Sequence, residues 1–188
     1  MRLFTVGLLA LIANAANATT PPPTPIDSGY WEYGSWRVIA ETIDTGEDLR
    51  RTCTALTGGD GEPTLSVAIS NGDGGPPSYF PGVGVSEHAI RGYSTVMQDG
   101  QPVYIRFDDE DSMDSVVGGY FDEDGFAHAF FRFDHPDSQW VLRAMRKNHQ
   151  LDAVVGGHVF ATFFLDGFTA AYVKAMDECG FSGAGVVD

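Results

Sequence analysis

The sequence predicts a mainly β fold, an antiparallel β-sandwich or barrel-like domain with two C-terminal helices at about 138–148 and 167–179. Three observations carry this prediction. Apolar and polar residues alternate in several short runs, which is the pattern of strands with one buried face. Clusters of Gly, Asp and Asn separate these runs, and such clusters are typical of turns. Helical periodicity, in contrast, stands out only near the end of the chain.

The predicted strands differ in how apolar they are. Residues 65–70 and 103–107 alternate, so each is expected to have one face in the core. A further strand from about 126 places Phe131 and Phe133 on its core face. Residues 158–165 (HVFATFFL) are apolar on both faces. We therefore expect this last segment to be a central strand that is covered on both sides.

The two predicted helices have recognisable ends. Asp137 and Ser138 stand where the first helix begins, and both residue types cap helix N-termini. The second helix carries an apolar stripe that includes Phe168 and, at its end, Cys179. Gly180 follows in a position typical of a helix C-terminus. Because Cys179 lies on the apolar stripe, we expect its side chain to face the core.

Residues 1–18 predict a cleavable signal peptide. Arg2 precedes an apolar run, which is followed by Ala16-Asn17-Ala18, with small residues at the two positions that a signal peptidase reads. The run is much shorter than the roughly 20 residues of a membrane-spanning helix. We therefore expect export to the periplasm or secretion, and the alternative is an N-terminus that anchors the protein to a membrane.

The rest of the chain divides into a Pro-rich leader, residues 19–30, and a single β-rich domain, residues 31–188. No later stretch has transmembrane length, so we expect no membrane insertion after signal cleavage. The 11 basic and 26 acidic residues give a net charge of −15. Such a field repels phosphate groups, and nucleic acid is therefore not an expected partner.

Cys53 and Cys179 are the two cysteines of the chain. In an oxidising compartment an even pair of cysteines usually forms a disulfide. We therefore predict a Cys53–Cys179 bond that fixes the last helix to an early strand. Two buried free thiols are the alternative. Neither cysteine lies in a Cys-x-x-Cys motif, which disfavours a redox-active role.

Several short motifs resemble the invasion-associated locus B family of exported alphaproteobacterial proteins. The strongest is LDGFTAAY at 165–172, and the segments 139–147, 34–38 (GSWRV) and 53–55 (CTA) follow the same order as in the family. The chain departs from the family at Ala40, where relatives often have a cysteine. The resemblance implies a divergent member with a mainly β fold. It also implies an exported binding or envelope-associated protein without catalytic activity, whose partner is an unknown protein or envelope component.

The acidic clusters are the sharpest candidates for a metal site. Residues 108–114 hold five acids, and Asp122-Glu123-Asp124 precedes Gly125. Calcium needs about six to eight oxygen ligands, but these clusters lack the alternating spacing and the distal Glu of a helix-loop-helix calcium site. We expect solvated loops and no tight calcium site. The five histidines show no helical metal-binding spacing, so we assign no metal or cofactor residues.

No sequence motif identifies catalytic residues, and we assign none. Tyr30, Trp31, Tyr33 and Trp36 could line a carbohydrate or peptide surface, but a core edge is the commoner use of such a cluster. Two rival functions remain open at this stage. One is a glycan-active hydrolase that uses an unrecognised pair of carboxylates, and the other is a structural component of an envelope assembly.

Overall fold

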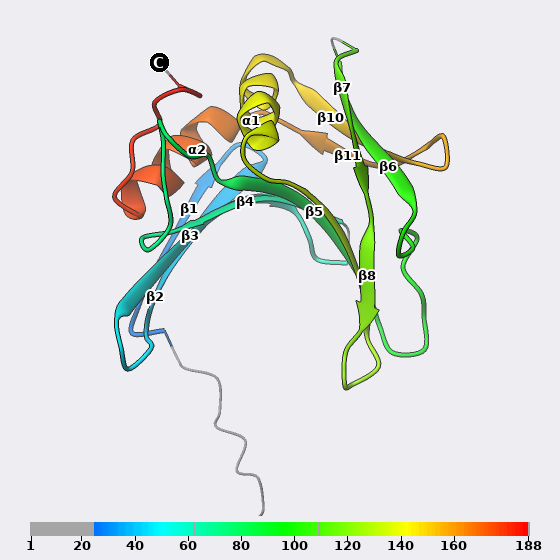
Figure 1. Cartoon of the computed structure of the whole chain (residues 1–188), viewed down its shortest axis with the longest axis horizontal. Coiled ribbons are helices and arrows are strands. Elements are labelled where there is room, and N and C mark those ends of the chain that lie inside the picture. Colours follow the sequence, from blue (N-terminus) through cyan, green and yellow to red (C-terminus); the bar gives the residue numbers. More distant parts are fainter. Residues whose placement is uncertain (1–24, 62, 109, 188) are drawn as a thin grey trace, which may run out of the picture.

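A computed structural model describes residues 25–61, 63–108 and 110–187 (Figure 1). The predicted signal peptide and the first part of the leader lie outside the described residues. The fold is mainly β, as predicted, with two antiparallel sheets and two helices near the C-terminus. The strands are β1 (Asp27–Tyr33), β2 (Trp36–Asp44), β3 (Leu49–Gly58), β4 (Thr64–Ser70), β5 (Gly82–Ala89), β6 (Pro102–Phe107), β7 (Ser112–Val116), β8 (Gly118–Phe121), β9 (Ala127–Phe133), β10 (Gln150–Val155) and β11 (His158–Phe164).

The larger sheet has seven strands in the order β1-β2-β3-β4-β5-β9-β8. Its side chains alternate between two faces, because successive residues of a strand point to opposite sides. In β2, Trp36 and Val38 are buried while Arg37 and Ile39 are only partly covered. The buried side forms the core, and we call it the covered face. The other side of the same sheet is called the open face.

The two helices cover the sheet from one side. Helix α2 (Phe168–Glu178) contacts β1 to β4, and helix α1 (Asp137–Lys147) contacts β5 and β9. Figure 1 shows that the seven-stranded sheet bends into an arch and that both helices lie on its outer side. The open face is therefore the inner, concave side of the arch. Neither described helix is long and apolar enough to cross a membrane.

The smaller sheet has the order β11-β10-β6-β7, and it corrects one expectation. The apolar segment 158–165 is not a central strand, because β11 lies at the edge of this sheet. Phe164 is 61 % exposed, although its neighbour Phe163 is buried. The central position belongs to β10, in which Asp152 and four apolar residues are all buried. An apolar strand can thus stay at an edge when another strand takes the interior.

Both helices confirm the sequence prediction, but the start of α1 differs from it. Pro136 is the N-cap residue of α1, and no side chain caps the helix. Ser138 is buried inside the first turn, where its hydroxyl donates a hydrogen bond to the carbonyl oxygen of Phe80 (3.3 Å). The predicted capping role is therefore wrong, because this hydroxyl serves the packing of α1. Helix α2 ends before Gly180, whose φ of 79° suits glycine, as predicted.

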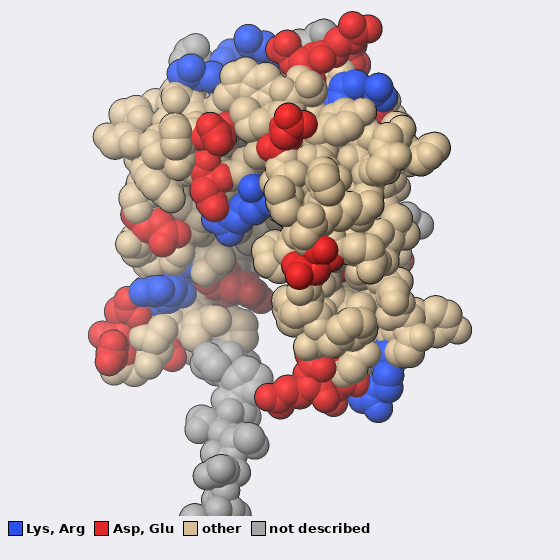
Figure 2. All heavy atoms as spheres, turned by 45° about the vertical axis from the view of Figure 1, so that its right-hand side comes forward, with Lys and Arg blue, Asp and Glu red and all other residues tan. Residues whose placement is uncertain are grey.

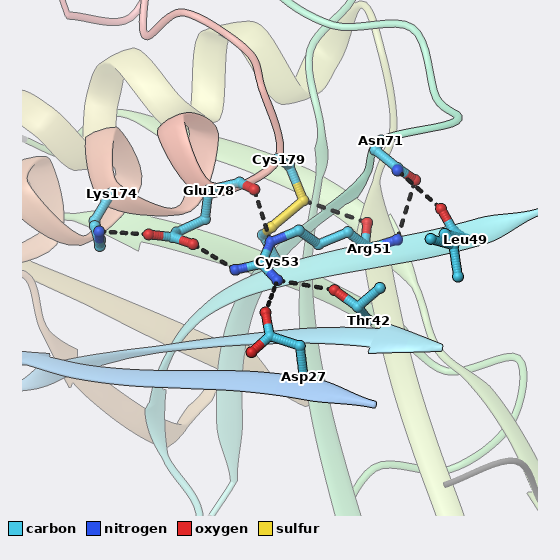
Figure 3. A network of polar contacts seen from close by, with 9 residues as sticks. All are labelled: Asp27, Thr42, Leu49, Arg51, Cys53, Asn71, Lys174, Glu178 and Cys179. Atoms are coloured by element: carbon cyan, nitrogen blue, oxygen red, sulfur yellow. Dashed lines mark hydrogen bonds and ion pairs between the residues drawn. A yellow bond between two sulfur atoms is a disulfide. The ribbon is translucent and has the colours of Figure 1, made fainter. Parts of the chain in front are cut away.

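The predicted disulfide is present. Cys53 of β3 and Cys179 at the end of α2 are bonded, with their Cα atoms 6.0 Å apart. Figure 3 shows that Arg51, two residues before Cys53, reaches the same end of α2. Its guanidinium donates to the carboxylate and to the carbonyl oxygen of Glu178, and Lys174 donates to the same carboxylate. A covalent bond and an ion network therefore both hold α2 on the sheet.

Strand β1 begins earlier than the predicted start of the domain. Asp27 already pairs with Thr42 of β2, so residues 27–30 belong to the sheet and not to the leader. Local packing explains the difference. The ring of Trp31 lies over Gly29, at a place that a Cβ atom would fill, and Lys174 sits 4.1 Å above the same ring.

Candidate functional site

Exposed aromatic and apolar side chains gather at one end of the molecule. They come from the loop between β5 and β6, from β8 and from the start and middle of β9. We call this set the aromatic end; it consists of Ile90, Tyr93, Val96, Tyr120, Phe121, Phe126 and Phe130, all exposed. Large apolar patches that remain exposed on a folded protein commonly mark binding surfaces.

Figure 2 brings forward the side of the molecule that carries β6, β7 and β8. This side shows a broad surface on which few charged side chains are visible, with acidic and basic groups together at its lower tip. Arg91 lies 3.5 Å from the Asp124 carboxylate and 6.0 Å above the Phe126 ring, so a charged pair borders the exposed ring of Phe126. The aromatic end therefore has a polar rim, as protein-binding surfaces do.

Hydrogen bonds hold the loop that carries three of the seven residues of the aromatic end. The Glu87 carboxylate accepts from the backbone N–H groups of Val96 (2.7 Å) and Met97 (3.0 Å). The Asp99 carboxylate accepts from the N–H of Gly119 (3.0 Å), which ties the loop to β8. Met97 itself is fully buried. The exposed side chains are thus presented from an anchored backbone, which lowers the entropy lost on binding.

A small hollow of about 130 Å³ lies between this loop and β8, and Tyr120, Phe121 and His128 are among its lining residues. The hollow is far smaller than the roughly 300 to 1,000 Å³ typical of small-molecule pockets. Its position at the aromatic end suits an inserted side chain of a larger partner.

A histidine cluster borders the aromatic end on the open face. His88 of β5 and His128 of β9 are direct cross-strand neighbours, and their Nδ1 atoms are 2.7 Å apart. The Nε2 atom of His128 is 2.9 Å from a carboxylate oxygen of Asp122. Tyr120 stacks on the His128 ring at 4.8 Å. The hydrogen bond from His128, helped by the N–H of Phe126, lowers the pKa of Asp122 below its ordinary value.

Sequence reasoning missed this cluster because it compared histidines only along the chain. His88, the partner of His128, is 40 residues away in the sequence. His135 lies in the turn that leads into α1, where its ring contacts those of Tyr79 and Phe80. His149 and His158 are exposed and stand apart from the pair.

The structure disperses the acidic run. Asp108 accepts from the backbone N–H groups of His149 and Gln150, and Asp114 is exposed on β7. Asp122 belongs to the histidine cluster, and Asp124 pairs with Arg91. Among the residues that the structure describes, no group of three or more His, Cys, Asp or Glu side chains could hold a metal ion. The run therefore offers no calcium cage in the described parts of the chain.

The best place for a hydrolase is a polar hollow beside β6 and β10, which contains Asp108, Glu110 and Asp152. Burial raises the pKa of Asp152, but hydrogen bonds from Arg106, Thr162 and Gln150 outweigh it and lower the pKa. Glycoside hydrolysis requires a general acid, whose pKa must be raised so that it keeps its proton. The lowered pKa favours the ionised form of Asp152, whereas that acid must be protonated.

The aromatic cluster at 30–36 does not form one surface. Trp36 is buried against Phe168, with ring centroids 5.0 Å apart, and its indole N–H donates to the Phe164 carbonyl oxygen (3.1 Å). Trp31 and Tyr33 pack partly against the core. Tyr30 alone of the four is exposed, and it points to the open face. The core interpretation of this cluster is therefore the one that fits.

No family model, curated protein or solved structure matches the chain. The resemblance to the invasion-associated locus B family consequently rests on the sequence motifs alone and stays a prediction.

Proposed function

We propose that this protein is exported and acts by binding another protein of the cell envelope or the exterior, without chemistry of its own. The observation that carries the proposal is the aromatic end, in which seven large apolar side chains are exposed on anchored backbone. The Cys53–Cys179 disulfide supports the export, because such bonds persist mainly in oxidising compartments. The resemblance to exported locus B proteins agrees both with export and with a binding role.

The chemistry of the aromatic end favours a protein as the partner. Tyr and Phe are enriched at protein–protein interfaces, and Tyr is among the residues that most often anchor them. Lipid membranes with anionic headgroups suit it poorly, because Asp122, Glu123 and Asp124 lie in the hairpin beside Phe121 and Phe126.

Site-specific photocrosslinking in intact cells tests the proposal. A photoreactive residue replaces Phe121 or Tyr93 at the aromatic end, and Val173, which is exposed on α2, provides the control position. We expect one protein adduct from positions 121 and 93, absent or much weaker from 173. The same preparation gives the intact mass, which should correspond to a chain beginning at Thr19.

Three results would overturn the proposal. Equal adducts from all three positions would mean that the aromatic end has no special role. No protein adduct from either aromatic position would exclude a protein partner. A chain that keeps residues 1–18 in the cytosol would refute the export.

A further inference from the structure

We propose that His88 and His128 form a binding site for a late first-row transition metal ion, with Cu²⁺ bound most tightly. The inference starts from the geometry of the histidine cluster. The two residues face each other across β5 and β9, where neighbouring strands hold opposite side chains close together. Their Nδ1 atoms approach to 2.7 Å on the open face of the sheet.

Asp122 determines which nitrogen of His128 is free. A neutral imidazole has one N–H donor and one nitrogen with a lone pair. The ionised Asp122 carboxylate can only accept a hydrogen bond, so the proton of His128 is on Nε2, 2.9 Å away. The Nδ1 atom of His128 therefore carries a lone pair. With both rings neutral, His88 donates its own Nδ1 proton across the 2.7 Å contact.

Two nitrogen atoms thus share one proton, and a metal ion can take its place. When Cu²⁺ binds, the Nδ1 proton of neutral His88 would move to its own Nε2, so that each ring keeps one N–H and presents Nδ1 to the ion. With metal–nitrogen bonds of about 2.0 to 2.1 Å, two such ligands at 90 to 110° lie roughly 2.8 to 3.4 Å apart. In the hydrogen bond the two Nδ1 atoms point at each other, so the rings must move apart and turn until both lone pairs converge on the ion. His88 can make this turn because it is exposed.

The surroundings of His128 are those of an oriented metal ligand. A carboxylate that accepts from the second ring nitrogen fixes the tautomer and strengthens the ligand, as Asp122 does here. Tyr120 stacks almost parallel on the ring, with an interplanar angle of 10°. His128 is therefore held in place and His88 is the adjustable partner.

The type of metal follows from the donor atoms. Imidazole nitrogens suit copper, zinc and nickel, and within such a site the affinity rises toward Cu²⁺. Calcium and magnesium need oxygen ligands and are not expected here. Because the described residues offer no third His, Cys, Asp or Glu ligand at this point, solvent water completes the coordination on the concave side of the arch.

Calorimetric titration with Cu²⁺ tests the site, using protein purified without a histidine tag. We expect one ion per chain, with an affinity that falls as the pH is lowered. His88→Ala and His128→Ala should abolish this binding. Asp122→Asn should weaken it about 10- to 100-fold, the usual effect of removing a carboxylate that orients a ligand. The electron paramagnetic resonance spectrum of the bound Cu²⁺ should show coupling to two imidazole nitrogens.

His149→Ala and His158→Ala are the matched controls, since both residues are exposed and lie outside the cluster. They should bind Cu²⁺ as the parent protein does. His88→Gln provides a second variant in case His88→Ala fails to fold, and circular dichroism confirms the fold of each. Failure of the parent protein to bind Cu²⁺ would overturn the proposal. The same holds if binding survives in His128→Ala or is lost in a control variant.

Discussion

The two ends of the seven-stranded sheet use the same residue types in opposite ways. At the β1–β4 end, Trp36 of β2 and the α2 residues Phe168 and Tyr172 are fully buried between the helix and the sheet. At the β5–β9–β8 end, Tyr120, Phe121 and other aromatic side chains remain exposed. Aromatic residues thus stabilise the fold at one end and are available for contacts at the other.

The two ends differ in whether another element is fixed over the sheet. Helix α2 is joined to β3 by the disulfide and to Arg51 by the Glu178 carboxylate, so its apolar stripe stays on the sheet. At the other end the last strand, β8, has only four residues and is followed by a short hairpin. An aromatic residue therefore becomes core or surface according to whether a distant element is fixed above it.

Removal of the disulfide should have the largest effect on the covered end. Its cysteines are 126 residues apart, and in the chain-entropy description a loop of this size stabilises the fold by close to 5 kcal/mol. We expect Cys53→Ala/Cys179→Ala to lower the free energy of unfolding, measured in urea, by about that amount. The parent protein in reductant should give a similar value. A loss below about 1 kcal/mol would show that packing alone holds α2.

Phe168→Ala should have the next largest effect. We expect it to lower the free energy of unfolding by about 4 kcal/mol, because truncation of a buried aromatic side chain leaves a cavity. Phe168 is 1 % exposed and contacts both Trp36 and Tyr172. Phe164→Ala is the matched control. Phe164 is exposed on β11, so its truncation should change the free energy of unfolding little. If Phe168→Ala has the denaturation midpoint of the parent protein, α2 is an interaction element and not part of the core.

Glu178→Gln should cost about 1 to 2 kcal/mol near neutral pH, because it weakens charge-assisted hydrogen bonds. Hydrogen bonds from Lys174 and Arg51 lower the pKa of Glu178 below its ordinary value of 4.5. A carboxyl whose pKa is lowered by folding stabilises the protein above its unfolded pKa and loses this effect as the pH falls through the folded value.

The cost of Glu178→Gln should therefore shrink in acid, and urea unfolding at neutral pH and at pH about 3 measures this change. Glu123→Gln, which changes an exposed carboxylate in the β8–β9 hairpin, serves as the control. If Glu178→Gln destabilises the protein equally at both pH values, the hydrogen bonds of the Glu178 carboxylate with Lys174 and Arg51 are not the cause of the loss.

Features that depend on local sequence could be predicted, and those set by distant partners could not. The fold class and both helices follow from periodicity. The Cys53–Cys179 pairing could be predicted across 126 residues because the chain has two cysteines, a predicted signal peptide and Cys179 on an apolar stripe. The edge position of β11 could not be predicted, because β10 is equally apolar and only their order in the sheet decides which is covered. The role of Ser138 depends on Phe80, 58 residues away.

The candidate site was harder to predict than the fold for the same reason. An exposed aromatic side chain such as Phe121 looks the same in the sequence as a buried one. Only the presence or absence of another element packed over it distinguishes the two. His88 and His128 form a pair only because β5 and β9 are neighbours while three strands and a long loop separate them in sequence. Cross-strand register would have been the signal that reveals the pair.

Phe121→Ala is the smallest expected effect on stability and the sharpest test of the comparison between the two ends. It deletes the same atoms as Phe168→Ala, but from a side chain that is 67 % exposed on an edge strand. Truncation there opens no cavity, so the free energy of unfolding should stay within about 0.5 kcal/mol of the parent value. The same variant should reduce the adduct formed by a photoreactive residue at Tyr93, since it removes one of the exposed aromatic side chains of the proposed surface. If Phe121→Ala instead destabilises the protein as much as Phe168→Ala, the aromatic end belongs to the core. Both ends of the sheet would then use their aromatic residues in the same way, and the proposed binding surface would be wrong.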